Sequence, residues 1–448
     1  MTTIIRVLDR IRERKGIIES LSNIGWLGGD RILRMFGGVV VGVAVARYLG
    51  PSQFGFLNFA LAIYGLFNII SNLGLDSLVI RDIALDESGE PEILGTAFVL
   101  KGAASVLTTL AAITVAHLLD PHNRVLLVIV ILMSVASISQ AFDVIDYLFQ
   151  AQTKSRYTVV PRNIAFVCAS VARLAAVFMH MGLLIFAWIS ALEVLLAEIG
   201  LGISYLCFRR PLPRWNWHVP RAKSQLAESW PLLIASVTIV IYMRTDQILL
   251  GKMASMTVVG NYAAAIRLSE IWYAIPIIIG ASVMPRLLRT RKQYPARYYA
   301  RLQRLYESMV LIAVSVAVVM QFAGPFLVRL LYGGAFASAA SILSVHIWTG
   351  VFVFVGCIGG QQYVHERVTF SSLQRTALGA IVNIALNLLW IPRWGGMGSA
   401  MATLVAQGIG SYFGDAFDPS TRHIFSMKTQ AYLKFWMLPR LVIQGMAE

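Results

Sequence analysis

Charged residues are scarce in this 448-residue sequence, at 14% of the total, whereas soluble domains usually contain about 25%. Hydrophobic residues make up 57%. Apolar runs of about 20 residues recur along the whole chain, and each is long enough to cross a ~30 Å hydrocarbon core as a helix. The composition therefore predicts an all-α membrane protein that spans the bilayer many times.

Cysteine is equally rare, since the chain has only three: Cys168, Cys207 and Cys357. All three lie within or beside apolar runs, so we expect small core residues and neither a disulfide set nor a metal site. The sequence also lacks the ATP-binding pattern GxxxxGK[ST] and the metal-binding patterns HExxH and CxxC. We therefore expect no cofactor, no metal and no ATPase within this chain.

Acidic residues are fewer than basic ones, 23 against 38, which gives a formal net charge of +15. Basic cytoplasmic loops explain such an excess in a membrane protein, and basic patches that bind nucleic acid do not normally alternate with membrane spans. We therefore predict no nucleic-acid partner. The predicted outer connections are too short to fold a catalytic domain, so the chain is predicted not to be an enzyme.

Twelve transmembrane helices are predicted, in two bundles of six. The expected spans are residues 24–46, 54–74, 93–118, 125–149, 158–180, 183–207, 231–251, 256–284, 305–331, 337–362, 370–391 and 396–416. The predicted domains are a basic amphipathic cytoplasmic N-terminus at 1–22, an N-terminal bundle at 23–207, a basic cytoplasmic linker at 208–230, a C-terminal bundle at 231–417 and a cytoplasmic tail at 418–448.

The distribution of basic residues predicts the orientation. If the N-terminus is cytoplasmic, 25 of the 38 Lys and Arg residues fall in cytoplasmic segments and only four on the opposite side. The four are Arg47, Arg124, Lys252 and Arg393. Because cytoplasmic loops are enriched in Lys and Arg, both termini are predicted to be cytoplasmic.

A weak repeat relates the two halves of the chain. The first half contains "YLGPSQFGFLNFALAI" and the second contains "LLGKMASMTVVGNYAAAIRL". In each, a helix ends at Leu-Gly, a short turn follows, and a glycine precedes an Ala-rich helix. Halves with six spans each share one topology, so we expect two bundles around a central cavity, as in many secondary transporters. Chance similarity between Ala- and Gly-rich spans is the alternative explanation.

Several predicted spans keep charged residues, each at a cost of at least ~2.5–3.5 kcal/mol at the bilayer centre. The first span contains Asp30, Arg31 and Arg34, and Arg244 and Asp246 occupy the equivalent place in the seventh. Intramembrane charges generally face a water-filled cavity or a substrate path. The alternative is that they form salt bridges that only fix helix packing.

Arginine suits an anionic substrate, because its planar guanidinium can donate hydrogen bonds to two phosphate oxygens at once and stays charged when desolvated. The predicted substrate-binding residues are Arg31, Arg34, Arg162, Arg244 and Arg267. The acids are predicted either to balance these charges while the cavity is empty or to couple transport to an ion. The predicted balancing or coupling residues are Asp30, Asp143, Asp146, Asp246 and Glu270.

Five stretches, in order along most of the chain, resemble the polysaccharide or O-antigen flippase family of the multidrug/oligosaccharidyl-lipid/polysaccharide exporter superfamily. They are "ARYLGPSQFGFLNFALAI", "TDQILLGKMASMTVVGNYAAAIRLSE", "LVRLLYGGAFASAASIL", "VNIALNLLWIPRWGGMGSAMATLVA" and the tail "FGDAFDPSTRHIFSMKTQAYLKFW". These motifs are mostly Gly, Pro and small residues at turns and packing faces. They indicate the architecture, and they do not identify any substrate-binding residue in this chain.

The resemblance implies a twelve-helix transporter in the bacterial inner (cytoplasmic) membrane. It would move undecaprenyl-pyrophosphate-linked oligosaccharide repeat units, such as those of O-antigen in lipopolysaccharide, to the outer leaflet by alternating access, with ion coupling. Membrane lipid and proteins that polymerise the polysaccharide and set its chain length are the expected partners. The main alternative is a cation-coupled multidrug exporter of the same superfamily, and a membrane polymerase or ligase is a further one.

Overall fold

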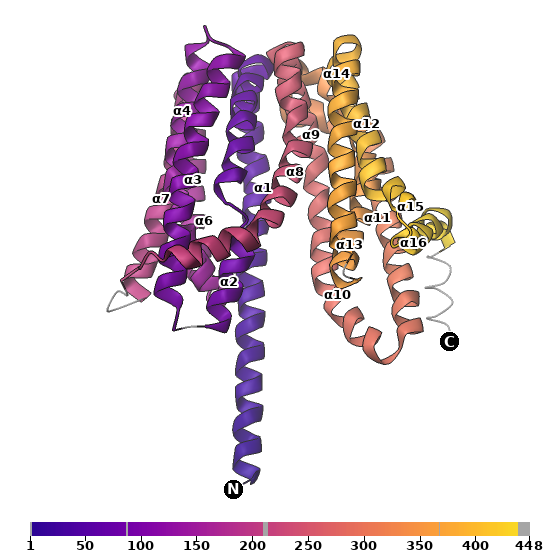
Figure 1. The fold of residues 1–448 in the computed structure, drawn as a ribbon. Coiled ribbons are helices and arrows are strands. Elements are labelled where there is room, and N and C mark those ends of the chain that lie inside the picture. The colour runs from indigo at the N-terminus through magenta and orange to yellow at the C-terminus, as the bar shows by residue number, and fades with distance from the viewer. Residues whose placement is uncertain (1, 87, 209–213, 367, 438–448) are drawn as a thin grey trace. The chain divides into compact units, whose positions relative to one another are not determined.

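The computed structural model describes residues 2–86, 88–208, 214–366 and 368–437, and within these ranges every regular element is a helix (Figure 1). Nine of the described helices are long and apolar enough to cross a membrane. A tenth candidate is the pair Gly334–His346 and Thr349–Glu366, if these two helices, bent by 49°, form one span. The predicted fold class, an all-α polytopic membrane protein, is confirmed.

Two of the candidates are much longer than one span requires. Gly28–Leu85 has 58 residues and Phe370–Phe417 has 48, whereas about 20 residues cross a bilayer. Each contains a glycine with non-helical backbone angles, Gly50 at φ 69° and Gly395 at φ 52°, so each is broken near its middle. Twelve crossings would follow if both helices cross twice, but the count of twelve is not confirmed.

The chain divides into two compact units, with residues up to Tyr48 and Ala60–Val237 in unit 1, and Leu49–Phe59 and the described residues from Thr238 in unit 2. The boundary between Val237 and Thr238 lies within α8. The elements from the N-terminus to α8 are α1 (Thr2–Ser71), α2 (Asp76–Leu85), α3 (Glu90–Leu119), α4 (Arg124–Ser137), the 3₁₀ helix η1 (Ile138–Asp143), α5 (Val144–Ala151), α6 (Arg156–Phe178), α7 (Leu183–Phe208) and α8 (Val219–Met253).

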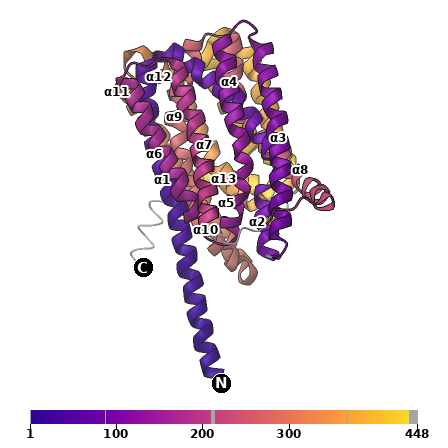
Figure 2. The ribbon, with the colours of Figure 1, turned by 90° about the vertical axis from the view of Figure 1, so that its left-hand side faces the viewer.

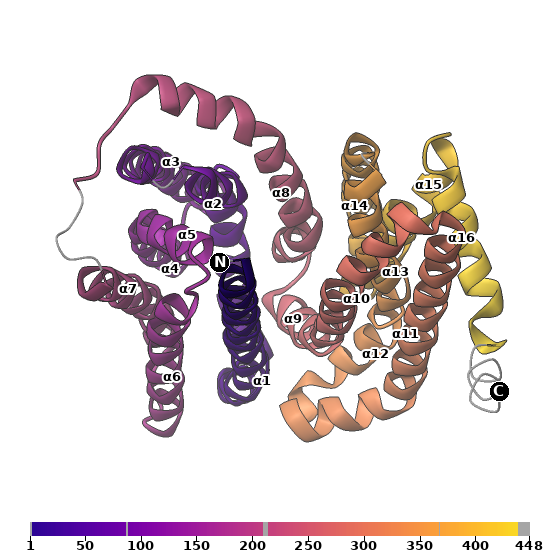
Figure 3. The same ribbon diagram turned by 90° about the horizontal axis from the view of Figure 1, so that it is seen from below.

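The elements beyond α8 all belong to unit 2. They are α9 (Met256–Glu270), η2 (Ile271–Tyr273), α10 (Ala274–Gln293), α11 (Pro295–Tyr332), η3 (Gly334–Phe336), α12 (Ala337–His346), α13 (Thr349–Glu366), α14 (Thr369–Gly408), the π-helical η4 (Ile409–Phe413), α15 (Gly414–Phe417), α16 (Arg422–Lys434) and η5 (Phe435–Met437). Figure 3 shows α16 beside α11.

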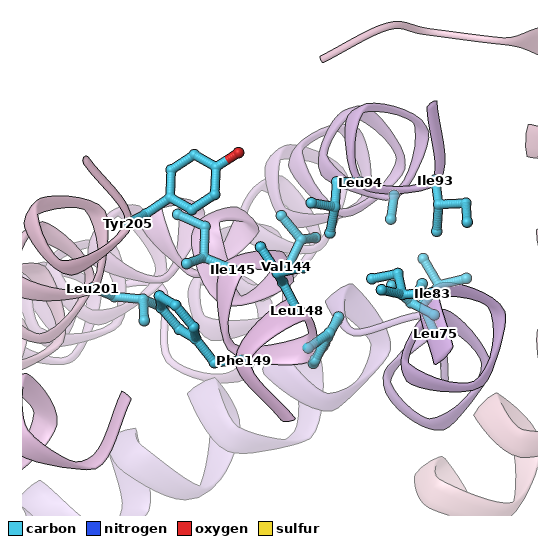
Figure 4. Close-up of a cluster of buried hydrophobic side chains, with 13 residues drawn as sticks. Leu75, Ile83, Ile93, Leu94, Val144, Ile145, Leu148, Phe149, Leu201 and Tyr205 are labelled. Carbon is cyan, nitrogen blue, oxygen red and sulfur yellow. The ribbon is translucent and has the colours of Figure 1, made fainter. Parts of the chain in front are cut away.

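The buried core at one end of unit 1 joins α2, α3, α5 and α7 (Figure 4). Leu75, Ile93 and Leu148 have no exposed surface and come from three different parts of the chain. Figure 2 shows α3 beside α4, which follows it after a short turn. Burial of side chains of this size stabilises each by about 1.5–3 kcal/mol relative to exposure in water. This core fixes the helices that hold the charged residues described below.

Residues 219–230 of the predicted linker form the first part of α8, and polar contacts hold them to other helices of unit 1. Arg221 donates from Nε to Glu92 at 2.7 Å, and Arg81 donates to Glu228 at 2.8 Å. Residues 209–213 of this linker and 438–448 of the predicted tail lie outside the described residues.

The glycines of the sequence repeat make the closest backbone approach in unit 2. A Cβ on Gly55 would lie 1.8 Å from the carbonyl oxygen of Met256, and one on Gly260 would lie 1.9 Å from that of Pro51. Glycine is the residue that permits such an approach, because it has no Cβ. The start of the second predicted helix therefore packs directly against the start of α9.

Candidate functional site

Arg162 of α6 links two carboxylates in unit 1. Its Nη2 lies 2.5 Å from Asp143 and its Nη1 lies 3.0 Å from Asp146. Asp143 ends η1 and Asp146 lies in the first turn of α5, so the two acids lie three residues apart on either side of the junction between the 3₁₀ segment and the α-helix. A 3₁₀ segment within a longer helix often marks a hinge. Three residues that were predicted as site residues thus form one ion-pair cluster.

Lys101 of α3 belongs to the same cluster, although no role was predicted for it. It is 2% exposed, and its Nζ lies 3.3 Å from Asp143 and 2.9 Å from the hydroxyl of Tyr147. Tyr147 in turn donates to Oδ1 of Asn72 at 2.8 Å. A lysine within an apolar run, followed by aspartates in the next span, was the available signal for this partner. Tyr147 and Asn72 carried no such signal.

Asp30 and Arg34 pair with each other on α1, at 2.8 Å between Oδ1 and Nε. This pairing follows from their spacing, because residues four apart share a helix face. The Arg34 guanidinium also lies 5.5 Å from the ring centroid of Phe166 on α6. The side chains of Arg34 and Arg162 remain 34% and 28% exposed, so neither is fully covered by other parts of the protein. Arg31 is exposed.

In unit 2, Asp246 of α8 is 3% exposed and accepts hydrogen bonds from the hydroxyl of Tyr262 and, at 2.7 Å, from the backbone N–H of Gln247. Tyr262 has no exposed surface and lies on α9. Arg244, two residues before Asp246, is exposed. Asp246, a predicted balancing or coupling residue, is therefore hydrogen-bonded to a tyrosine. Among the described residues it forms no ion pair.

Arg244 and Arg267 both interact electrostatically with Glu270 in unit 2. Arg267 and Glu270 lie in the last turn of α9, and the Arg267 guanidinium is 5.6 Å from the ring centroid of Phe54. Glu270, like Asp143 in unit 1, lies where α-helix and 3₁₀ helix meet. Each unit thus combines predicted arginines with predicted acids.

A buried amide and hydroxyl network adjoins Tyr262 and had no predicted role. Thr403 lies 3.5 Å from the Tyr262 hydroxyl, accepts from Asn383 at 3.3 Å and donates to the carbonyl of Ser399 at 3.0 Å. Asn383 and Asn387 have no exposed surface. Their Asn-x3-Asn spacing places both on one face of α14, a signal that was present in the sequence.

A second unpredicted network joins α13, α14, α15 and α16. Asp415 forms ion pairs with Arg375 and, at 2.7 Å, with Lys428, and Tyr363 donates to the same carboxylate at 2.9 Å. Arg375 lies 3.7 Å above the ring of Tyr363. No sequence spacing indicates this cluster, because its members come from four separate helices.

The described residues contain no group of three or more His, Cys, Asp or Glu side chains arranged to hold a metal ion. The predicted site residues gather into groups within each unit. Asp143, Asp146 and Arg162 form one group, Asp30 and Arg34 a pair, and Arg244, Arg267 and Glu270 another group. A cavity shared by all five arginines stays a prediction.

Solved structures define the class of protein to which this fold belongs. The chain is similar to the lipid II flippase MurJ in an inward closed conformation, with a TM-score of 0.70, 13% identity and coverage of 92% of this chain and 91% of that one. It is also similar to a multidrug resistance MATE family transporter of the MOP superfamily in its inward-facing conformation, with a TM-score of 0.65, 12% identity and coverage of 93% and 99%. The fold is that of these multi-pass membrane transporters.

A sequence model described as "Polysaccharide biosynthesis protein" matches residues 20–291, more than half of the chain. The chain belongs to this polysaccharide biosynthesis protein family. Among curated proteins, a sequence comparison finds no match. The predicted family is confirmed at this level.

Proposed function

We propose that the protein is a flippase for lipid-linked oligosaccharides. It moves undecaprenyl-pyrophosphate-linked repeat units of a surface polysaccharide such as O-antigen from the inner to the outer leaflet of the bacterial inner membrane. Both termini face the cytoplasm, and proteins that polymerise the repeat units act after it. Family membership over residues 20–291 and the fold shared with a lipid II flippase support this proposal.

The observation that carries the chemistry is the placement of guanidinium groups in otherwise apolar helices of both units. Arg34 and Arg162 are paired with carboxylates yet remain about one-third exposed, and Arg244 is exposed beside Glu270. Such groups can exchange a carboxylate partner for the phosphate oxygens of a diphosphate without becoming unpaired. The neighbouring acids keep the arginines compensated before the substrate arrives.

Transport proceeds by alternating access in this proposal. Two bundles rock about the substrate site, Arg31, Arg34, Arg162, Arg244 and Arg267 hold the diphosphate and acidic sugars in a wet cavity, and the polyprenyl tail stays in lipid. Asp30, Asp143, Asp146, Asp246 and Glu270 balance charge or couple the cycle to an ion. The guanidinium groups lower the cost of moving a diphosphate headgroup through a low-dielectric layer.

Replacement of Arg34 or Arg244 by Ala tests the proposal in cells whose surface polysaccharide depends on this protein. Loss of a charge-assisted interaction of ~1.5–3 kcal/mol predicts a drop in polysaccharide of about tenfold or more at unchanged protein level. Arg47→Ala is the matched control, because Arg47 is an exposed residue of the same helix α1 outside the proposed site. Normal polysaccharide in both Arg34→Ala and Arg244→Ala cells would overturn the assignment of these residues.

The second candidate function, multidrug export, is favoured by the fold shared with MATE family transporters. Cationic drugs suit a cavity dominated by acids and aromatic rings, whereas the predicted cavity helices are rich in arginine. Increased resistance to cationic dyes on overexpression, with no effect on surface polysaccharide, would support this alternative and contradict the flippase.

A further inference from the structure

Glu198 lies in α7 with only 6% of its surface exposed, and its Oε2 atom has no hydrogen-bond partner. Helix α7 packs tightly on α6 at this level, since a Cβ on Gly200 would lie 2.7 Å from the side chain of Pro161. Burial of an ionised carboxylate without full pairing carries a large desolvation cost. Glu198 falls within the sixth predicted span, residues 183–207, and the transport proposal gives it no role.

The surroundings of Glu198 are dominated by other charges. Helix α7 packs on η1, which ends at Asp143, and electrostatic interactions link Glu198 to Asp143, Arg162 and Lys101. Two neighbouring buried carboxyl groups do not both ionise at low cost, and one shared proton supplies the missing donor.

The titratable groups linked to Glu198, directly or through one another, come from most of the helices of unit 1. They are Lys101 of α3, Asp143 of η1, Asp146 and Tyr147 of α5, Arg162 of α6, Tyr64 of α1, which interacts with Asp143, and Asp76 of α2, which interacts with Tyr147. Helix α4 also packs on α7 but has no titratable residue apart from Arg124 at its first position.

The charges of this cluster balance only when one acid is protonated. Lys101 and Arg162 are positive, whereas Asp143, Asp146 and Glu198 are all negative when ionised, so these five groups carry one excess negative charge. Asp76 is not counted because it is exposed. Asp143 and Asp146 each already accept an ion-pair contact from Arg162. Glu198 is therefore the acid on which a proton completes the hydrogen bonding.

We propose that Glu198 is a proton-binding site that couples transport to proton movement. This inference deepens the proposed flippase function and rests on it. With the proton bound, Glu198 donates to Asp143, and Arg162 bridges Asp143 and Asp146. When the proton leaves to water, the new Glu198 carboxylate repels Asp143 and attracts Arg162. The bridge that ties α6 to η1 and α5 then weakens.

Infrared difference spectroscopy of the full-length protein in lipid tests the site with the proton itself as the ligand. We expect the wild-type protein to show the carbonyl stretch of a protonated carboxyl group that disappears as pH rises. Glu198→Gln should lose this band. Glu193→Gln is the matched control, because Glu193 lies on the same helix, is bound to Arg173 at 2.7 Å, and should leave the band unchanged.

A band that persists in Glu198→Gln, or that Glu193→Gln removes equally, would overturn the proposal. In cells, Glu198→Gln fixes the neutral form, so polysaccharide should fall at least tenfold at normal protein level, while Glu193→Gln retains export. A wild-type protein that carries the Glu198 band but supports no polysaccharide would overturn the flippase and leave the proton site intact. Wild-type export without such a band would overturn the proton site alone.

Discussion

Lys428 has no exposed surface, and its ammonium group has three acceptors close by. Nζ lies 2.7 Å from Asp415, 2.7 Å from the carbonyl of Ser411 and 2.8 Å from the hydroxyl of Tyr363. A buried ammonium is tolerated when it is paired and fully hydrogen-bonded. Lys428 therefore anchors α16 to the rest of unit 2.

Lys428→Ala is expected to destabilise the docking of α16 by ~3–5 kcal/mol, because it removes the ammonium and its hydrogen bonds from a buried cluster. The measurement is the rate at which a protease cleaves α16 in purified protein, together with the thermal unfolding temperature. Lys434→Ala, at an exposed position on the same helix, should change neither. Equal protease resistance of Lys428→Ala and the wild-type protein would show that the buried pair does not hold the helix.

Among single residues, the pair Asp30 and Arg34 could be predicted from sequence, because an i,i+4 spacing on a helix brings side chains together locally. The bridge from Arg162 to Asp143 and Asp146 could not, since its members lie 16 to 19 positions apart on different helices. The presence of a charge in a span is local information. The identity of its partner depends on which helices pack together.

At the level of elements, the two repeat motifs pack closely against each other in unit 2. Gly55 and Gly260 each lie against the backbone of the other's segment, close to Met256 and Pro51 respectively. Each copy of the repeat thus has a glycine at the point where the two copies approach each other. Gly50, directly before Pro51, has a positive φ of 69°, which allows the chain to change direction between helices.

Gly260→Ala is expected to be severely destabilising, because its Cβ would lie 1.9 Å from a carbonyl oxygen and the backbone would have to move. Overpacking of this kind costs ~1–3 kcal/mol or more. The amount of folded protein in the membrane and its unfolding temperature measure the effect. Gly360→Ala is the control, as nothing lies within 4 Å of the Cβ it would add. If both variants were equally stable, the close approach of the repeat motifs would be wrong.

For the whole molecule, orientation is the prediction that rests on the greatest number of residues. Cysteine labelling tests it in a variant without Cys168, Cys207 and Cys357. A single cysteine at Gln53, exposed in the predicted outer turn, should react with a membrane-impermeant maleimide in intact cells. A cysteine at Lys154, exposed in a predicted cytoplasmic loop, should react only after permeabilisation. The reverse pattern would place the termini outside.

The amino-acid sequence was sufficient to predict an all-α membrane protein, because the hydrophobicity of about 20 consecutive residues indicates a membrane-spanning helix. It also showed which residues are charged within the predicted spans. The packing of the helices was needed to show that Lys101 joins Arg162 and its two acids, that α7 with Glu198 packs on η1, which ends at Asp143, and that Lys428 of the predicted cytoplasmic tail is buried. These contacts link residues distant in sequence, and their energies depend on burial and on partners from other helices, which no local pattern specifies.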